Sequence, residues 1–187
     1  MMRYASRWLV ALGVVLLTGC GYNRIQGLDE QVNKAQGQIQ AQLQRRADLI
    51  PNLVETVKGY AKQEQTIFTA VADARARLAG SVQSGNLEEM AAANQAMNAP
   101  LGRLLALVEN YPDLKSDANF RALQDELTGT ENRIATARQD YNDAVNQFNS
   151  FIRTFPYNLT AKMFGHDRSR AYFEARAGTA EPPPVKF

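Results

Sequence analysis

The chain has 187 residues, with 21 lysines and arginines against 19 acids, and its single cysteine and single histidine are Cys20 and His166. These counts exclude an internal disulfide, and they leave too few ligands for a zinc site made of cysteine and histidine. The charge is nearly balanced and no basic run exceeds two residues, which excludes the basic patch expected of a nucleic-acid-binding protein.

Residues 1–19 have the pattern of a lipoprotein signal peptide. Arg3 and Arg7 precede the apolar run "WLVALGVVLL", residues 8–17. A helix of that length rises only about 15 Å, which is half of the hydrocarbon thickness of a bilayer. A basic start, a short apolar centre and small residues at the end are typical of a secretory signal, so we expect this segment to be removed.

The end of the leader, Leu17, Thr18, Gly19 and Cys20, resembles the bacterial lipobox. That resemblance implies a diacylglycerol on the thiol of Cys20, cleavage before it and acylation of the new amino group with a fatty acid such as palmitate. Three acyl chains anchor a protein stably, whereas one is marginal. The alternative is a free thiol. Gly21 does not give the signal for inner-membrane retention that an aspartate gives at that position.

Loss of Arg3 and Arg7 with the leader takes the 21 basic residues to 19, equal to the 19 acids. After a linker at residues 20–27, apolar residues recur every seven positions from 28 to 79. One helix over that range would be about 78 Å long. We expect a break at 48–51 instead, although the continuous heptad phase favours a kink there.

Three charged residues mark the expected junction. Asp48 is a candidate N-cap, and Arg45 and Arg46 suit the end of a preceding helix. They are also candidates for a partner-binding patch. Arg46 and Glu64 interrupt the apolar tracks, so each is expected to be half-buried and paired, and Glu64 is in addition a weak candidate for a catalytic carboxylate.

The second half predicts three further helices. Asn86 followed by Glu89 indicates a capping box, and apolar residues at spacings of three and four continue to residue 111. A long helix is expected over 117–155, and a short one over 158–164. The apolar stripe of the long helix consists of Phe120, Leu127, Ile134, Tyr141, Phe148 and Phe155.

These stripes predict an all-α fold, an antiparallel bundle of long helices over residues 28–175 with a short C-terminal helix closed by Gly165. The final stretch, 176–187, contains "EPPPVKF" and is expected to be a disordered, proline-rich tail.

The segment "QRRADLIPNLVETVKGYAKQE", residues 44–64, closely resembles the signature of the LemA family, bacterial membrane-associated proteins. The likeness continues over 103–165 and into "YFEA" at 172–175. It implies an up-and-down four-helix bundle beside a membrane, and no established activity. Gln63 stands where members often have histidine, and His166 where they often have phenylalanine, which argues against a catalytic role for either position. Many members keep a longer apolar N-terminal span, which the lipobox replaces here.

Other polar and aromatic residues are candidates for sites but have simpler interpretations. Glu131, Asn132 and Arg133 in "TENRI" are expected to make inter-helix contacts or to face solvent rather than bind a ligand, and His166 is expected in a loop. The remaining candidates form either a bundle cap or a membrane-facing lip. They are the aromatic residues Tyr157, Phe164, Tyr172 and Phe173.

Three classes of function remain. The first, which we favour, is a non-enzymatic, lipid-anchored module of the cell envelope that binds another envelope protein on the outer side of the membrane, periplasmic in a Gram-negative cell. The second is a membrane-shaping protein whose amphipathic helices act on lipid. The third is a carboxylate-based envelope hydrolase, although the sequence has none of the common catalytic motifs. No cofactor, metal, nucleic acid or small-molecule substrate is expected.

Overall fold

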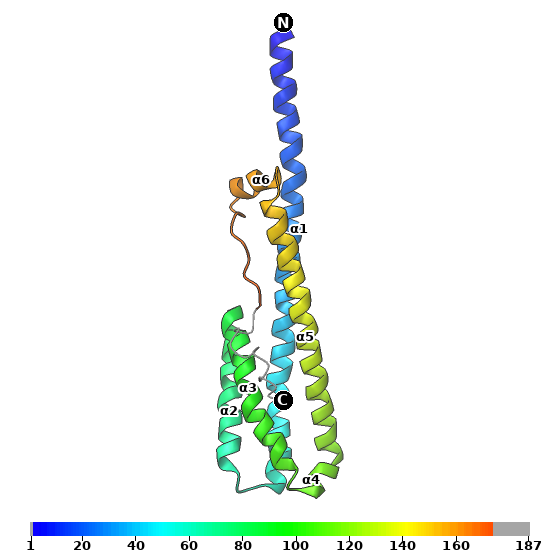
Figure 1. Cartoon of the computed structure of the whole chain (residues 1–187), viewed down its shortest axis with the longest axis vertical. Coiled ribbons are helices and arrows are strands. Elements are labelled where there is room, and N and C mark those ends of the chain that lie inside the picture. The colour runs from blue at the N-terminus through cyan, green and yellow to red at the C-terminus, as the bar shows by residue number, and fades with distance from the viewer. Residues whose placement is uncertain (1, 174–187) are drawn as a thin grey trace, which may run out of the picture. The chain divides into compact units, whose positions relative to one another are not determined.

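The computed structural model describes the backbone of residues 2–173 and the side chains of residues 21–173. Within that range the chain forms six helices and no strand, which confirms the all-α prediction (Figure 1). The predicted tail at 176–187 lies outside the described residues. The helices are α1 Met2–Tyr60, α2 Gln65–Ser84, α3 Leu87–Val108, α4 Pro112–Ser116, α5 Ala118–Arg153 and α6 Tyr157–Met163.

The described residues form two compact units. Unit 1 comprises residues 2–37 and 139–172, and unit 2 comprises residues 38–138 together with Phe173. The long helices α1 and α5 contribute to both units. No helix among the described residues has an apolar stretch long enough to cross a membrane.

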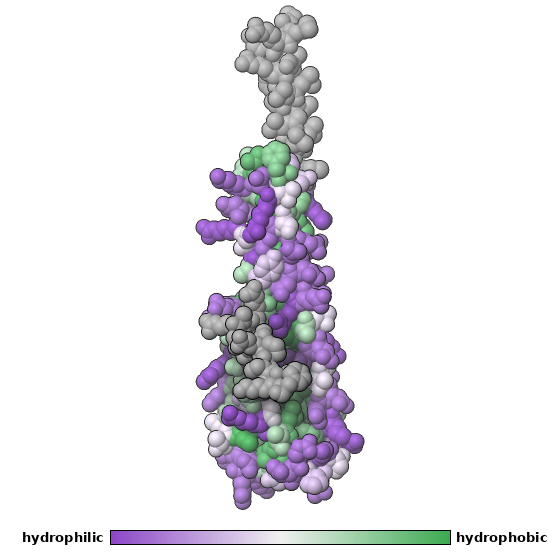
Figure 2. Space-filling view, in the orientation of Figure 1, coloured by the Kyte–Doolittle hydropathy of each residue, from purple (hydrophilic) through white to green (hydrophobic). Residues whose placement is uncertain are grey.

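Unit 2 contains the expected four-helix bundle, made from the second part of α1, all of α2 and α3, and the first part of α5. Successive helices run in opposite directions, and the short α4 turns the chain from α3 into α5 (Figure 1). On the face drawn in Figure 2, hydrophilic side chains lie along both edges of this part of the molecule, with some hydrophobic surface between them. The fully buried side chains include Leu43, Leu53, Leu78, Met90, Met97, Leu104 and Ile134.

Helix α1 is continuous through Pro51, so the expected break at 48–51 is wrong. A proline inside a helix leaves the carbonyl four residues earlier without its N–H donor. Here that carbonyl belongs to Ala47, and Nε of Arg75 on α2 donates to it at 3.0 Å. The tertiary contact replaces the lost bond, and the first helix of the bundle ends at Tyr60 instead, before a turn at 61–64.

The cap of α3 is confirmed with one difference in detail. The side-chain oxygen of Asn86 accepts from the backbone N–H groups of Glu88 and Glu89. In a standard capping box the Glu89 carboxylate would return to the Asn86 backbone N–H. Instead it accepts from the Asn86 side-chain amide at 3.1 Å, and the backbone N–H of Asn86 donates to the hydroxyl of Ser84.

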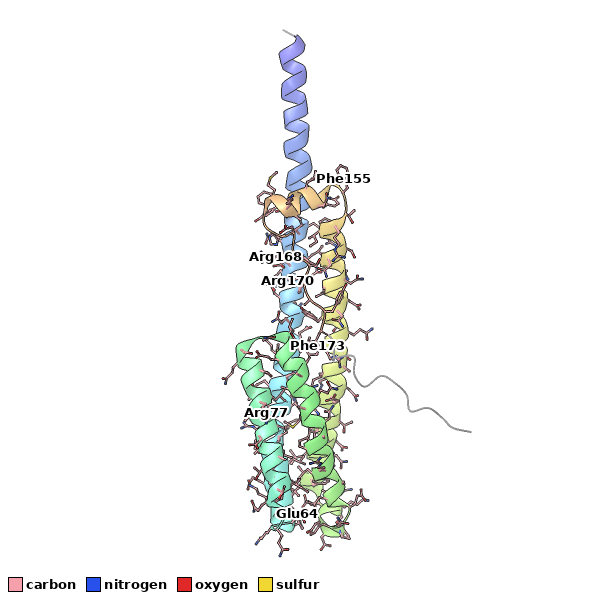
Figure 3. All side chains as sticks on the ribbon, turned by 60° about the vertical axis from the view of Figure 1, so that its left-hand side comes forward. Glu64, Arg77, Phe155, Arg168, Arg170 and Phe173 are labelled. Atoms are coloured by element: carbon pink, nitrogen blue, oxygen red, sulfur yellow. The ribbon has the colours of Figure 1, made fainter. Side chains whose placement is uncertain are left out.

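The heptad stripe of α5 is confirmed as far as Phe148. The members of the stripe from Phe120 to Phe148 are each at most 7% exposed. Phe155 is 75% exposed, so the assignment of Phe155 to the stripe is wrong. The helix ends at Arg153, and the chain turns at Pro156. Phe155 therefore leaves the helical face before the seven-residue repeat reaches it, and its side chain points outward (Figure 3).

Unit 1 contains the first part of α1, the second part of α5, the short α6, and an extended strap at 164–172. The strap is tied to both long helices. Arg170 makes an ion pair with Asp29 on α1 at 2.7 Å, and its backbone N–H and C=O bond the side-chain amide of Asn149 on α5 at 2.8 and 2.9 Å. The hydroxyl of the buried Tyr141 donates to the carbonyl of Ala171 at 2.9 Å.

Candidate functional site

Arg45, Arg46 and Asp48 do not form one site in unit 2. Successive helical residues point in directions about 100° apart, so neighbours in sequence diverge. Arg45 reaches across to α5, where its Nε donates to Glu126 at 2.8 Å. Asp48 accepts a hydrogen bond from Gln44 on its own helix at 2.8 Å. The capping role expected for them at a helix junction is also wrong, because α1 has no junction there.

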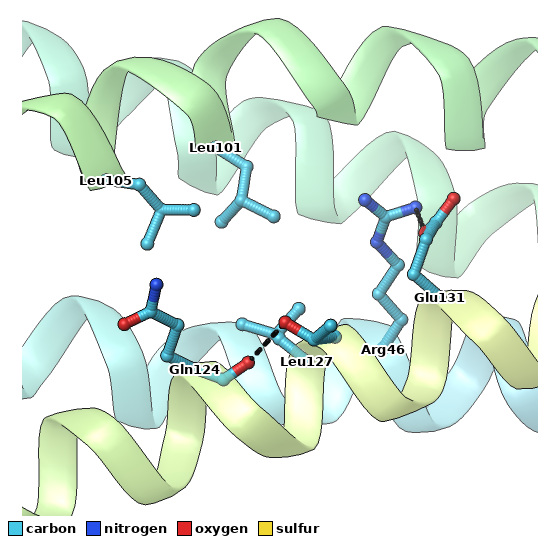
Figure 4. A pocket seen from close by; sticks show the side chains of 7 residues that line it. Arg46, Leu101, Leu105, Gln124, Leu127 and Glu131 are labelled. Carbon is cyan, nitrogen blue, oxygen red and sulfur yellow. Dashed lines mark hydrogen bonds and ion pairs between the residues drawn. The ribbon is translucent and has the colours of Figure 1, made fainter.

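Arg46 instead lies inside the bundle, with only 4% of its surface exposed. One guanidinium nitrogen binds the side-chain oxygen of Asn94 on α3 and a carboxylate oxygen of Glu131 on α5, the latter at 2.6 Å. The other donates to the side-chain oxygen of Asn98 on α3 at 2.8 Å. A single cation thus links three helices, and Figure 4 shows its contact with Glu131. The interruption of the apolar track predicted a half-buried, paired arginine, and the structure shows a paired arginine that is buried.

Arg45 and Arg46 differ in their electrostatic environment. Burial lowers the pKa of Arg46, and the charge of Glu131 opposes that shift. The hydrogen bond from Arg45 lowers the pKa of the Glu126 carboxyl, assisted by the charges of Arg45 and Arg133. The Arg46 network joins a buried guanidinium to two asparagines and the half-exposed Glu131, whereas the Arg45 contact belongs to a surface cluster whose energy is screened by water.

A pocket of about 160 Å³ lies beside the Arg46 network in unit 2. Its walls are mostly apolar, and its one acid is Glu131, which already pairs with Arg46. The hydroxyl of Thr128 donates to the backbone carbonyl of Gln124 (Figure 4). The pocket therefore lacks two facing carboxyl groups, the arrangement that acid–base hydrolysis of a glycoside requires. Its lining is Arg46, Leu101, Leu105, Gln124, Leu127, Thr128 and Glu131.

The other polar candidates also take structural positions. Glu64 is half-buried in the turn before α2, where its side chain makes no capping bond. Arg133 meets Glu126 at 3.4 Å, and Asn132 is exposed. His166, in unit 1, lies 2.8 Å from the side-chain amide of Gln26 and packs edge-on against Phe148. Among the residues described, no group of three His, Cys, Asp or Glu could hold a metal ion.

Of the four aromatic candidates, two are packed against other side chains and two are largely exposed. Tyr157 stacks on Phe151 with ring centroids 4.3 Å apart. Phe173 is buried in unit 2 beneath the guanidinium of Arg138, 5.4 Å from the ring centre. Phe164 and Tyr172 are exposed by 49% and 43%.

The strap residue Arg170 was missed by sequence analysis. It lies in an irregular segment, where no periodic pattern identifies which residues are buried.

A shallow groove of about 480 Å³ lies between α2 and α3 in unit 2. Arg77 and Glu89 supply charges of opposite sign, and the remaining lining is made of small residues. Small side chains allow the backbone of another helix to approach closely. The small residues of the groove are Gly80, Ser81, Ala92, Ala93 and Ala96.

The residues around the expected lipid site lie in unit 1. The backbone of Cys20 lies within α1. The next residue, Gly21, is buried against α6. A Cβ on Gly21 would lie 2.8 Å from Cδ1 of Tyr157, which is closer than real Cβ atoms approach. Tyr22, one residue later, contacts the ring of Phe164 at a centroid distance of 4.6 Å. α6 is therefore seated on the two residues that follow Cys20.

Comparison with known proteins gives related sequences of two kinds. Two magnetosome proteins of Paramagnetospirillum magneticum, MamQ 1 and MamQ 2, are each 28% identical to this chain, with 84% of the chain and 66% of the relative aligned. The protein LemA of Metamycoplasma hominis is 24% identical, with 83% and 70% aligned. The chain thus spans just under two thirds of the length of the MamQ proteins. The sequence model of the LemA family matches residues 35–187, and the chain belongs to that family.

Proposed function

We propose that this protein is a non-enzymatic helical module, anchored to a membrane of the bacterial envelope through acylated Cys20, and that it binds another envelope protein. Membership of the LemA family supports this proposal. The names of its relatives, which refer to the magnetosome or to the family itself, denote no reaction.

The observation that carries the non-enzymatic part is the Arg46 network. Acid–base active sites typically place titratable groups with perturbed pKa values in a concave pocket, where those groups can reach a substrate. The arginine that lines the 160 Å³ pocket of unit 2 is held by Asn94, Asn98 and Glu131, and the pocket's single carboxylate is one of those partners. This arrangement favours cohesion of the bundle over catalysis.

The membrane part rests on the leader and on Cys20, which follows Leu17, Thr18 and Gly19 in the order of a lipobox. Acylation there would put the helical units outside the cytoplasm, because a lipobox directs export before modification. Several acyl chains give stable anchoring without a membrane-spanning helix.

Cys20→Ser should abolish incorporation of radioactive palmitate and leave the protein unprocessed or released from membranes. The reason is that only the thiol of Cys20 can accept the diacylglycerol, since the chain has no other cysteine. Thr18→Ser, at the tolerant lipobox position, is the matched control and should keep full labelling. Labelling and sedimentation with the membrane that are identical in the Cys20→Ser protein and the wild type would contradict lipid anchoring at this residue.

The binding surface that we propose for the partner is the groove between α2 and α3. Its small residues and its two opposite charges suit an α-helix of an envelope protein. Its exposed alanines offer positions where a probe can be introduced without disturbing the core.

A photoreactive amino acid at Ala96 should therefore crosslink to a discrete partner in intact cells. The matched control is Ala135, an exposed alanine on the α5 helix that does not line the groove. We expect a crosslinked band from Ala96 that is absent from Ala135, detected by immunoblotting of isolated membranes. The same bands from both positions, or none from Ala96, would rule out the groove as the binding surface.

A further inference from the structure

Unit 1 exposes a cluster of large apolar side chains on and beside α6. Leu159 and Met163, spaced four residues apart on one face of the helix, are 59% and 70% exposed. Phe155 precedes α6 with 75% exposure, and Phe164 follows it with 49%. These four residues are here called the α6 patch, and Figure 2 shows green, hydrophobic surface at the α6 end of the described part of unit 1. Single exposed apolar residues are ordinary, whereas a cluster of four indicates a contact surface.

The α6 patch lies beside the residue that is expected to carry the acyl chains. The opposite face of α6 is buried, with Thr160 at 4% and Ala161 at 0% exposure. That face rests on α1, where Gly21 meets Tyr157. Because one helical residue rises only about 1.5 Å, the backbone of Cys20 is adjacent to this contact. Acyl chains on Cys20 would therefore enter a bilayer next to the α6 patch.

Basic residues outnumber acidic residues around the patch. Residues 21–28 and 144–166 contain no aspartate or glutamate and carry Arg24, Arg153 and Lys162, and the exposed Asp167 and Arg168 follow with opposite charges. Arg24, Arg153 and Lys162 are exposed as well. An apolar helix face bordered by basic side chains is the combination that binds the interface of membranes containing anionic lipid.

We propose that the α6 patch is a second membrane contact, which inserts into the interface of an anionic bilayer next to acylated Cys20. The proposal rests on the proposed anchoring, since Cys20 brings the patch to the lipid. Acyl chains alone form a flexible tether. A second contact, on a helix seated rigidly against Gly21 and Tyr22, fixes the angle at which unit 1 meets the membrane.

The test uses tryptophan fluorescence, because the one tryptophan of the chain, Trp8, lies in the leader that is removed when the chain is processed at Cys20. Met163→Trp therefore places the only tryptophan of the processed chain in the patch. Tyr172→Trp is the matched control, an exposed aromatic of the same unit whose hydroxyl reaches Asn146 on α5 rather than α6. Both processed, lipid-anchored proteins are purified from membranes and reconstituted into vesicles of phosphatidylethanolamine and phosphatidylglycerol whose acyl chains carry bromine, a short-range quencher.

We expect quenching at Met163→Trp to exceed that at Tyr172→Trp several-fold and to be accompanied by a blue shift of the emission. Equal quenching at the two positions would overturn the proposal. A blue shift of the Met163→Trp emission in the absence of vesicles would also overturn the proposal, because a second copy of the chain or another protein would then cover the patch. Circular dichroism checks that both variants keep the helical content of the parent protein.

Palmitate labelling separates this inference from the anchoring on which it rests. Labelling that persists in Cys20→Ser counts against the lipid anchor and leaves the quenching contrast to decide the α6 contact. Labelling that depends on Cys20 without a quenching contrast upholds the anchor and overturns the α6 contact.

Discussion

Phe148→Ala is expected to lower the free energy of unfolding by about 3–5 kcal/mol, the usual range for removing a buried aromatic ring. The ring of Phe148 is 1% exposed and packs against His166. Removing it deletes buried apolar surface and leaves a cavity that rigid neighbouring helices fill only in part. Urea unfolding followed by circular dichroism measures the change.

Phe155→Ala is the matched control, because both phenylalanines lie on the same seven-residue repeat. Phe155 is 75% exposed, so its loss should change the free energy of unfolding by about 0.5 kcal/mol or less. Equal losses for the two variants would mean that burial in unit 1 is not as described. The comparison therefore tests the end of the α5 stripe as well as its core.

Arg46→Ala should destabilise the protein by about 2–4 kcal/mol, because it removes the donors that satisfy buried polar partners. Asn94 is 7% exposed and would lose the guanidinium that binds its side-chain oxygen. The alkyl stem of the arginine would also leave a void in the core. Denaturant unfolding of the purified protein gives the magnitude.

Three further variants resolve the origin of that loss. Arg45→Ala removes the neighbouring exposed arginine and should have a much smaller effect. Glu131→Gln, at a side chain that is 48% exposed, should cost about 1 kcal/mol or less. Arg46→Met combined with Asn94→Leu removes the arginine together with its most buried partner and should recover most of the stability. A double variant as unstable as Arg46→Ala would show that the lost donor is not the cause.

Much of the helical architecture was determined by local sequence patterns. The α5 stripe from Phe120 to Phe148 follows a heptad repeat, and a helix with one strongly apolar face needs helices to cover it. Asn86 marked the start of α3, because its side chain can satisfy N–H groups that the first turn leaves free. Such signals lie within a few residues of the structure that they specify, and they can be read without knowing the fold.

The continuity of α1 at Pro51 and the burial of Arg46 depend on contacts between residues that are distant in sequence. Pro51 lies within a continuous α1 because Arg75, on another helix, donates to the carbonyl that the proline leaves unpaired. Arg46 is central rather than superficial because Asn94, Asn98 and Glu131 surround it from two other helices. Neither the donor from α2 nor that set of acceptors can be recognised in the local sequence around residues 46–51.

The leader and the acylation of Cys20 are predictions from the sequence alone, because a lipobox is recognised as a short run of residues rather than as a packed structure. The exposure of Leu159 and Met163 and their place beside Gly21 were decided by tertiary structure. Periodicity cannot tell which face of a seven-residue helix will be covered. Here α1 covers the face that carries Thr160 and Ala161, since only an absent side chain at Gly21 lets Tyr157 approach so closely, and the apolar face is left outward.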